Sequence, residues 1–227
     1  MAKTYPQRAF MLPPGASELI VVRHGASAAA VPDQPFDLLD GHSDPPLAPE
    51  GEEQAGHVAE RLETESLSAI FVTPLQRTAQ TAAPLAGRLG LEPTVIPQLR
   101  EILLGDWEGG EFRIRAANGD PIVHKLFQEE RWDVIPGAER MEDFSARIAD
   151  GLSEAFDRTG PDARAVAVLH GGVISEICHQ VTGSRPFAFI QVDNASITRL
   201  VRFADGRLLL RSFNAIDHLS RNGVPSA

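Results

Sequence analysis

The chain has 227 residues, of which 43% are hydrophobic, so it can bury the core of one large domain or two small ones. Its formal net charge of −10 argues against nucleic acid as a partner, because phosphate backbones require a cationic surface. The single cysteine, Cys178, excludes an intrachain disulfide. No run approaches the roughly 20 apolar residues of a membrane span, and the first residues do not form a signal peptide. We therefore expect a cytoplasmic protein with no membrane partner.

The first half of the chain alternates predicted strands and helices. Residues 1–17 are expected to be a loose leader, followed by a buried strand at Leu19–Val22. Residues 26–49 are rich in Pro, Asp and Gly, which predicts a long loop, and loops of this length are usually functional. Apolar residues then recur at helical spacing up to Leu62 and again from Leu75 to Leu89. Short strands are predicted between and after these helices, at Ser68–Thr73 and Val95–Ile96.

The second half begins with a poorly patterned segment and then returns to alternation. We interpret residues 100–138 as a lid-like insertion, with Trp107, Phe112, Phe127 and Trp132 packed inside it or against a substrate. A helix is expected from Met141 to Phe156, a buried strand at Ala165–Leu169, and a helix through Val173–Val181. Asp205-Gly206 predicts a hairpin between two final strands at 196–203 and 207–213. This order predicts one α/β domain spanning 1–227, with a mainly parallel sheet covered on both faces.

Cationic side chains and histidines follow three of the predicted strands. Arg23-His24-Gly25 ends the first strand, Arg77 lies in the first turn after the second, and His170 precedes two glycines after a later one. If these strands are parallel neighbours, their carboxyl ends converge, and helix N-termini there favour anions. A neutral imidazole can attack phosphorus while arginines neutralise the phosphoryl oxygens. The sequence thus predicts phosphoryl transfer, for which Glu101, Asp106 and Glu108 are candidate acids.

Five segments in order resemble the histidine phosphatase superfamily, which has the phosphoglycerate mutase-like fold. They cover residues 19 to about 200 and read LIVVRHGAS, GHSDPPLAPEGEEQA, FVTPLQRTAQTA, LREILLGDWEG and VAVLHGGVI. The resemblance implies a three-layer α/β/α sandwich, no metal and no cofactor. It also implies the site residues, with His24 as nucleophile, Glu101 as proton donor, and a phosphate pocket formed by Arg23, Arg77 and His170.

The segment after His24 departs from the family pattern. Many members carry an asparagine a few residues after the Arg-His-Gly triplet. In this chain that asparagine is absent, and Ala30 is the residue nearest to its expected position. Ser27 remains as a phosphate contact, and Gly25 allows backbone or ligand to approach the imidazole. The apolar residues from Ala26 to Val31, with Phe36, Leu38 and Leu39, favour a bulky apolar phosphoester.

The function expected from these residues is metal-independent hydrolysis of a small phosphorylated metabolite through a phosphohistidine, as in histidine acid phosphatases. The alternative is a cofactor-dependent phosphoglycerate mutase, which needs further cations in the lid; a third reading is a non-catalytic module that binds phosphorylated ligands. Glu108 competes with Glu101 as proton donor. His42, in the long loop, is expected at the surface, with an approach to the site as the alternative, and a homodimer is possible. The cations available in the lid are Arg113, Arg115, Lys125, Arg131 and Arg140.

Overall fold

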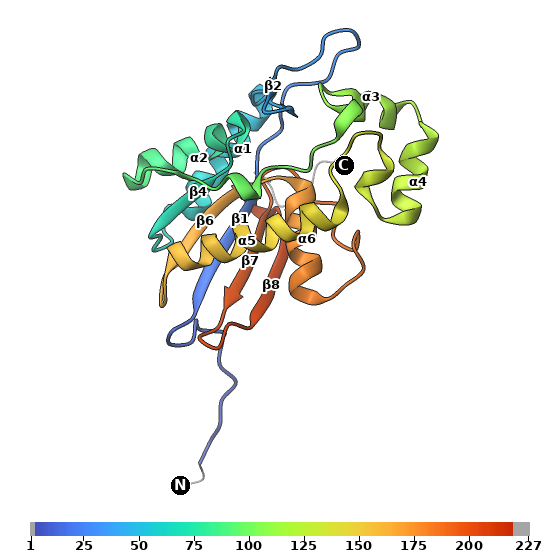
Figure 1. Cartoon of the computed structure of the whole chain (residues 1–227). Helices are drawn as coiled ribbons and strands as arrows, with labels where there is room; N and C mark the ends of the chain where they lie inside the picture. Colours follow the sequence, from blue (N-terminus) through green and yellow to red (C-terminus); the bar gives the residue numbers. More distant parts are fainter. Residues whose placement is uncertain (1–2, 220–227) are drawn as a thin grey trace.

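A computed structural model describes residues 3–219, and within them a six-stranded sheet forms the centre of the molecule (Figure 1). The strand order is β5-β4-β6-β1-β7-β8. The first four strands in this order are parallel to one another. Strand β7 is antiparallel to both of its neighbours, β1 and β8. The strands are β1 (Ser17–Arg23), β4 (Ala69–Val72), β5 (Thr94–Val95), β6 (Arg164–Leu169), β7 (Ile197–Arg202) and β8 (Leu208–Ala215).

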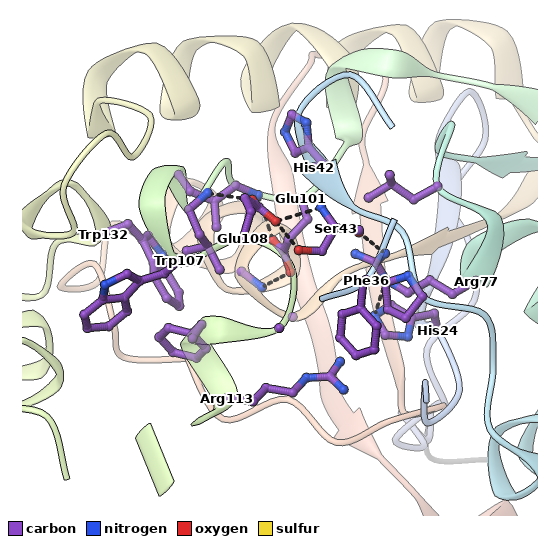
Figure 2. Close-up of a pocket in the computed structure, with 18 of the residues that line it drawn as sticks. His24, Phe36, His42, Ser43, Arg77, Glu101, Trp107, Glu108, Arg113 and Trp132 are labelled. Atoms are coloured by element: carbon purple, nitrogen blue, oxygen red, sulfur yellow. Dashed lines mark hydrogen bonds between the residues drawn. The ribbon is translucent and has the colours of Figure 1, made fainter. Parts of the chain in front are cut away.

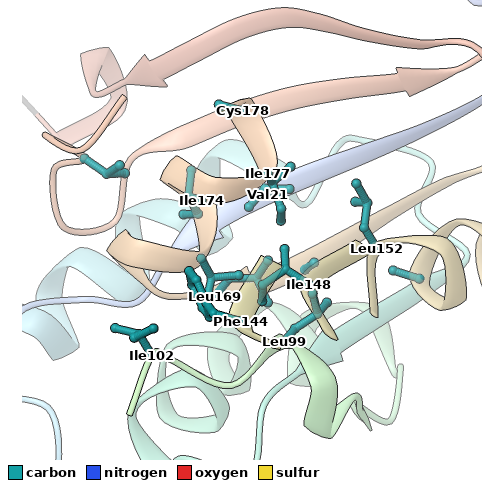
Figure 3. Packing of buried hydrophobic residues seen from close by; sticks show 14 of the residues in the cluster. Val21, Leu99, Ile102, Phe144, Ile148, Leu152, Leu169, Ile174, Ile177 and Cys178 are labelled. Atoms are coloured by element: carbon teal, nitrogen blue, oxygen red, sulfur yellow. The ribbon is translucent and has the colours of Figure 1, made fainter. Parts of the chain in front are cut away.

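Both faces of the sheet are covered by helices, because the central strands are apolar on both sides. Leu19 and Val21 of β1 belong to one buried cluster, and Ile20 and Val22 belong to the other. Helices α5 and α6 pack on the first cluster, where Ile148 and Ile177 meet Val21 (Figure 3). Helices α1 and α2 pack on the second. The four helices are α1 (Pro49–Leu62), α2 (Gln76–Leu89), α5 (Met141–Thr159) and α6 (Gly171–Thr182).

The segment between β5 and α5 lies beyond the carboxyl ends of the strands, on the side from which α3 and α4 project (Figure 1). It consists of short helices: η1 (Pro97–Leu99), η2 (Gly105–Trp107), α3 (Glu111–Ala117), α4 (Pro121–Glu129) and η3 (Trp132–Val134). A hairpin from the long loop after β1 lies beside it. Its strands are β2 (Leu38–Leu39) and β3 (His42–Ser43), and a last turn, η4 (Asp217–Leu219), follows β8.

The three-layer α/β/α sandwich and the mainly parallel sheet predicted from the sequence are confirmed. The differences are local: β1 begins at Ser17, so the leader is shorter than residues 1–17, and β5 lies one residue earlier than predicted. The described part of that leader carries no helix or strand before Ser17 and projects from the body of the molecule (Figure 1). No helix within residues 3–219 has both the length and the apolar character needed to cross a membrane.

Candidate active site

Three neighbouring parallel strands bring the predicted residues to one edge of the sheet. Strands β4, β6 and β1 are adjacent, so the segments that follow them converge. His24 directly follows β1, Arg77 is the second residue of α2, and His170 is the N-cap of α6. The rings of His24 and His170 lie edge to face with their centroids 5.3 Å apart. The structure therefore brings together side chains that are nearly 150 residues apart.

The hydrogen bonds of His24 fix which ring nitrogen carries the proton. Nδ1 lies 2.7 Å from the carbonyl oxygen of Gly25, which can only accept, so Nδ1 is protonated. On the other side, Nε of Arg77 donates to Nε2 of His24 at 3.2 Å. Nε2 therefore carries the lone pair of the ring, which here accepts the hydrogen bond from Arg77. This is the nitrogen that can act as a nucleophile.

Burial and neighbouring cations keep His24 neutral. Desolvation lowers its pKa well below the ordinary value, and the guanidinium groups of Arg77 and Arg23 lower the pKa further. The side chain is only 4% exposed. A neutral imidazole is thus available across the physiological pH range and below it.

The two arginines of the predicted phosphate pocket face His24 from different elements. Nη1 of Arg23 donates to the carbonyl of Val192, while its buried Nε has no partner among the described residues. Arg77 is also held by the carbonyl of Ser43, to which its Nη1 donates at 2.9 Å. Burial lowers the pKa of Arg77 to about 10, which leaves it cationic at neutral pH. A bound anion would complete the coordination of both guanidinium groups.

His170 lies behind His24 and does not line the cavity. It is fully buried, and its Nε2 is hydrogen-bonded to Oγ1 of Thr73 at 2.9 Å. Its Nδ1 has no partner within residues 3–219. Burial, and then the cations and rings around it, lower its pKa well below the ordinary value. The predicted contact of His170 with phosphate stays a prediction.

The two candidate acids lie in different surroundings. Glu101 lines the cavity, and its carboxylate accepts hydrogen bonds from the backbone N–H groups of Ile102 at 3.0 Å and Gly172 at 3.2 Å. Glu108 accepts from the N–H of Ser43 at 2.7 Å, from the Ser43 hydroxyl, and from the N–H of Leu104 at 2.8 Å. Both oxygens of Glu108 therefore hold the β3 segment against the lid.

These side chains surround a cavity of about 370 Å³ that is lined by both charged and aromatic side chains. In Figure 2 His24, Arg77 and Phe36 lie on one side, and Trp107 and Trp132 on the other. His42 also lines this cavity and is 7% exposed, so the prediction that it lies at the surface is wrong. The reason is the β2–β3 hairpin, which folds the long loop inward. Its place in the long loop makes an approach to the site the alternative expectation, but the spacing of residues in the sequence does not favour it.

Arg113 was one of five lid cations in the sequence, and the structure separates it from the others. It lies at the mouth of the cavity, where its guanidinium donates to Oγ of Ser27 at 2.7 Å and to the carbonyl of Ala28 at 2.8 Å. Ser27 itself is not among the residues that line the cavity. Its predicted contact with phosphate stays a prediction, and its observed partner is Arg113.

Gly25 allows the backbone of α1 to approach the segment after β1 closely. A Cβ atom at this position would lie 2.5 Å from the carbonyl oxygen of Gly51, in the first turn of α1. The backbone of α1, rather than a ligand, therefore occupies the space that the missing side chain leaves. The predicted role of Gly25 in substrate binding is not tested by this contact.

The described residues contain no group of three or more His, Cys, Asp or Glu side chains placed to hold a metal ion. The cations and carboxylates named above therefore define the chemistry that this chain itself can supply at the site.

The buried histidines should make the protein less stable in mild acid. Both His24 and His170 remain neutral in the fold, whereas in the unfolded chain they titrate near pH 6.5. Above that pH neither state binds the protons, and below it only the unfolded state does, so stability falls as pH falls. Each histidine contributes a slope of at most about 1.4 kcal/mol per pH unit. We expect the free energy of unfolding in urea to decrease accordingly from pH 6.5 to 5.

A matched pair of variants isolates this effect. The variant His170→Asn should show a shallower dependence on pH, because it lacks one of the two groups. The variant His124→Asn, at an exposed position of α4, should keep the slope of the unmodified protein. If the free energy of unfolding depended equally on pH in the two variants, the conclusion that His170 is neutral in the folded protein would be contradicted.

The comparisons with known proteins agree with this geometry. Residues 19–215 match the profile of the histidine phosphatase superfamily (branch 1). Phosphoglycerate mutase-like protein 4 of Arabidopsis thaliana is 31% identical over 215 residues, covering 91% of this chain and 89% of the relative.

Two solved structures with phosphatase names are similar to this chain. Mycobacterial glucosyl-3-phosphoglycerate phosphatase is 28% identical with a TM-score of 0.72, over 88% of this chain and 100% of that one. Phosphoserine phosphatase from Entamoeba histolytica, in a complex with phosphoserine, is 26% identical with a TM-score of 0.72, over 90% of this chain and 100% of that one.

Proposed function

Because the chain belongs to the histidine phosphatase superfamily (branch 1), whose enzymes are of phosphatase or mutase type, we propose that it is a metal-independent phosphomonoesterase. The observation that carries the proposal is the state of His24. Its Nε2 is unprotonated and carries the ring lone pair, and the side chain lines a cavity together with the guanidinium groups of Arg23 and Arg77. Relatives with phosphatase names support the same reading.

In the proposed first step Nε2 of His24 attacks phosphorus, and the bond from phosphorus to the ester oxygen breaks. The phosphoryl group is thereby transferred to the imidazole, and Glu101 gives its proton to the departing alkoxide. Arg23 and Arg77 neutralise the phosphoryl oxygens as charge develops on them. In the second step Glu101 takes a proton from water, the oxygen of that water attacks phosphorus, and the P–N bond breaks. Phosphate and neutral His24 are the products.

The lid favours hydrolysis over the mutase alternative. A mutase must hold a second anionic group of its substrate, and the sequence offers five lid cations for it. Four of these are paired on the lid with carboxylates and do not line the cavity, and only Arg113 reaches its mouth. The paired cations are Arg115, Lys125, Arg131 and Arg140.

The nature of the product separates these functions. The protein is incubated with EDTA and either p-nitrophenyl phosphate or 3-phosphoglycerate containing a trace of the bisphosphate, and the products are followed by ³¹P NMR. Release of inorganic phosphate in the presence of the chelator is the expected result. Isomerisation of the phosphoglycerate without net release would instead identify a mutase. Tight phosphate binding with no turnover of either compound would identify a binding module.

The assignment of the proton donor predicts different phenotypes for two glutamates. In Glu101→Gln, kcat/KM for ethyl phosphate should fall by about 10²–10⁴, the usual contribution of a general acid. The loss for p-nitrophenyl phosphate should be much smaller, because that leaving group departs without a proton. Steady-state kinetics with both esters measure the difference.

Glu108→Gln is the matched control for this pair. Since Glu108 holds Ser43 and Leu104, its replacement should lower the stability of the loop and reduce both rates by a similar factor. If instead the loss of kcat/KM depended on the leaving group in Glu108→Gln and not in Glu101→Gln, Glu108 would be the proton donor and Glu101 the structural residue.

The remaining expectations are part of the same proposal. The substrate is a small phosphorylated metabolite, the protein acts in the cytoplasm without nucleic acid or membrane, and a homodimer is possible. Size-exclusion chromatography with light scattering would test the last of these.

A further inference from the structure

We propose that the site is selective for phosphomonoesters whose alcohol carries a bulky apolar group and no second anion. This inference rests on the proposed phosphatase activity and adds the class of substrate. The part of the cavity beyond the arginines is here called the chamber. Its walls are formed by Leu104, Phe112, Phe127, Trp132 and Ile190.

The walls of the chamber are apolar, and their aromatic rings are packed through contacts with one another and with Phe187. Phe112 packs on Trp132 with their centroids 5.8 Å apart, and Trp132 packs on Phe187 with centroids 5.3 Å apart. Phe127 contacts the same Phe187 ring at 6.2 Å. These contacts hold the ring faces in place before any ligand arrives. A preformed apolar wall favours an apolar ligand, because little ordering is required on binding.

The charges around the cavity disfavour a second anionic group. Among the described residues the arginines that line it are Arg23, Arg77 and Arg113. The first two flank His24, where the phosphoryl group would bind. Arg113 is directed to the same side, since it donates to Ser27 and lies 5.7 Å from the centroid of Phe36. The other charged groups that line the cavity are the carboxylates of Glu101 and Glu108, which repel anions.

The Ser43 hydroxyl and Nδ1 of His42, two polar groups near the chamber, already have partners within the protein. The Ser43 hydroxyl donates to Glu108 and accepts from the N–H of Gly109 at 2.7 Å. His42 is buried beside them, with its Nδ1 3.2 Å from the carbonyl of Asp40. A sugar or a glycerate would therefore lose hydrogen bonds with water and gain few in return. An aromatic or branched aliphatic group would lose none.

The exposed ring of Phe127 extends the chamber outward. Phe127 is 50% exposed although it lines the cavity. A ligand that reached this ring would cover apolar surface that is otherwise in water. Burial of one phenyl group changes affinity by about 10- to 100-fold.

The test compares two ligands that differ only in an apolar group. Phenethylphosphonate and ethylphosphonate carry the same non-hydrolysable phosphoryl group, so calorimetry measures the chamber without any turnover. We expect phenethylphosphonate to bind about 10- to 100-fold more tightly. The corresponding phosphate esters, both of primary alcohols, should show the same preference in kcat/KM. Equal affinities, or tighter binding of 3-phosphoglycerate than of phenethylphosphonate, would overturn the inference.

Two phenylalanine variants locate the effect. Phe127→Ser should reduce the preference for the phenethyl ligand several-fold. Phe10→Ser, at a position that is 40% exposed and outside the cavity, should leave it unchanged. An unaltered preference in Phe127→Ser would place the apolar group elsewhere and contradict the assignment. Failure of both esters to release phosphate would refute the proposed activity, while the phosphonate affinities would still decide the selectivity.

Discussion

Replacement of His24 with alanine is expected to reduce kcat for phosphoester hydrolysis by a factor on the order of 10⁵ to 10⁶, the scale of nucleophile removal in other covalent enzymes. The imidazole is the group that would accept the phosphoryl group, and its unprotonated Nε2 carries the ring lone pair. Water in its place is a weaker nucleophile and is not held against phosphorus. The measurement is single-turnover phosphate release, with a rapid acid quench to detect acid-labile phosphate on the protein.

Binding should respond differently from turnover in the same variant. Arg23 and Arg77 remain, and each keeps its hydrogen bond to a backbone carbonyl, although Arg77 loses its bond to His24. The dissociation constant for ethylphosphonate should therefore change by less than about tenfold. The variant His124→Ala, on the exposed face of α4, should keep both turnover and labelling. Full activity in His24→Ala would end the proposed mechanism, and labelled phosphate on that variant would move the nucleophile to another residue.

The sequence predicted those parts of the site that follow directly from a strand or helix end. His24, Arg77 and His170 each adjoin a segment with a clear apolar pattern, and the topology rules bring such ends together. The six strands and four covering helices were predicted for the same reason. Their ends differ by one or a few residues, since the hydrogen bonds that end an element involve distant partners.

The contacts that depend on loops could not be predicted. Arg113 was one of five lid cations, and its position at the cavity follows from hydrogen bonds with Ser27 and Ala28, more than 80 residues earlier. His42 is buried because Glu108 holds the neighbouring Ser43. Neither pairing leaves a periodic trace in the sequence, because each joins two irregular segments.

Gly51 is a position where a contact between a helix and a loop changes the expected effect of a glycine-to-alanine substitution on stability. A glycine inside a helix usually costs about 1 kcal/mol relative to alanine, so the sequence suggests that Gly51→Ala would stabilise α1. In the structure a Cβ atom at Gly51 would lie 2.0 Å from the carbonyl oxygen of Ala26. That distance is far shorter than a van der Waals contact. The obstacle is backbone, which cannot rotate away as a side chain can.

We expect Gly51→Ala to lower the free energy of unfolding by about 3 kcal/mol, at the upper end of overpacking effects. The backbone at Ala26 is tied on both sides, since its N–H donates to Gln54 at 2.8 Å and its carbonyl accepts from Ala48 at 2.9 Å. The segment would therefore shift as a unit and move the Gly25 carbonyl that sets the tautomer of His24. Activity should fall together with stability, as measured by urea unfolding and by kcat/KM for p-nitrophenyl phosphate.

Gly56→Ala, in the same helix, separates the contact from the helical propensity. No atom outside the helix lies within 4 Å of a Cβ at Gly56, so the substitution should raise the free energy of unfolding by about 0.5–1 kcal/mol. Activity should be unaffected, because this position faces away from the loop after β1. Opposite signs for the two alanine variants would show that the approach of α1 to residues 25 and 26 positions the nucleophile. If both alanine variants were more stable than the unmodified protein, the loop after β1 would be able to move away from a Cβ atom at position 51. His24 would then be oriented without the support of α1.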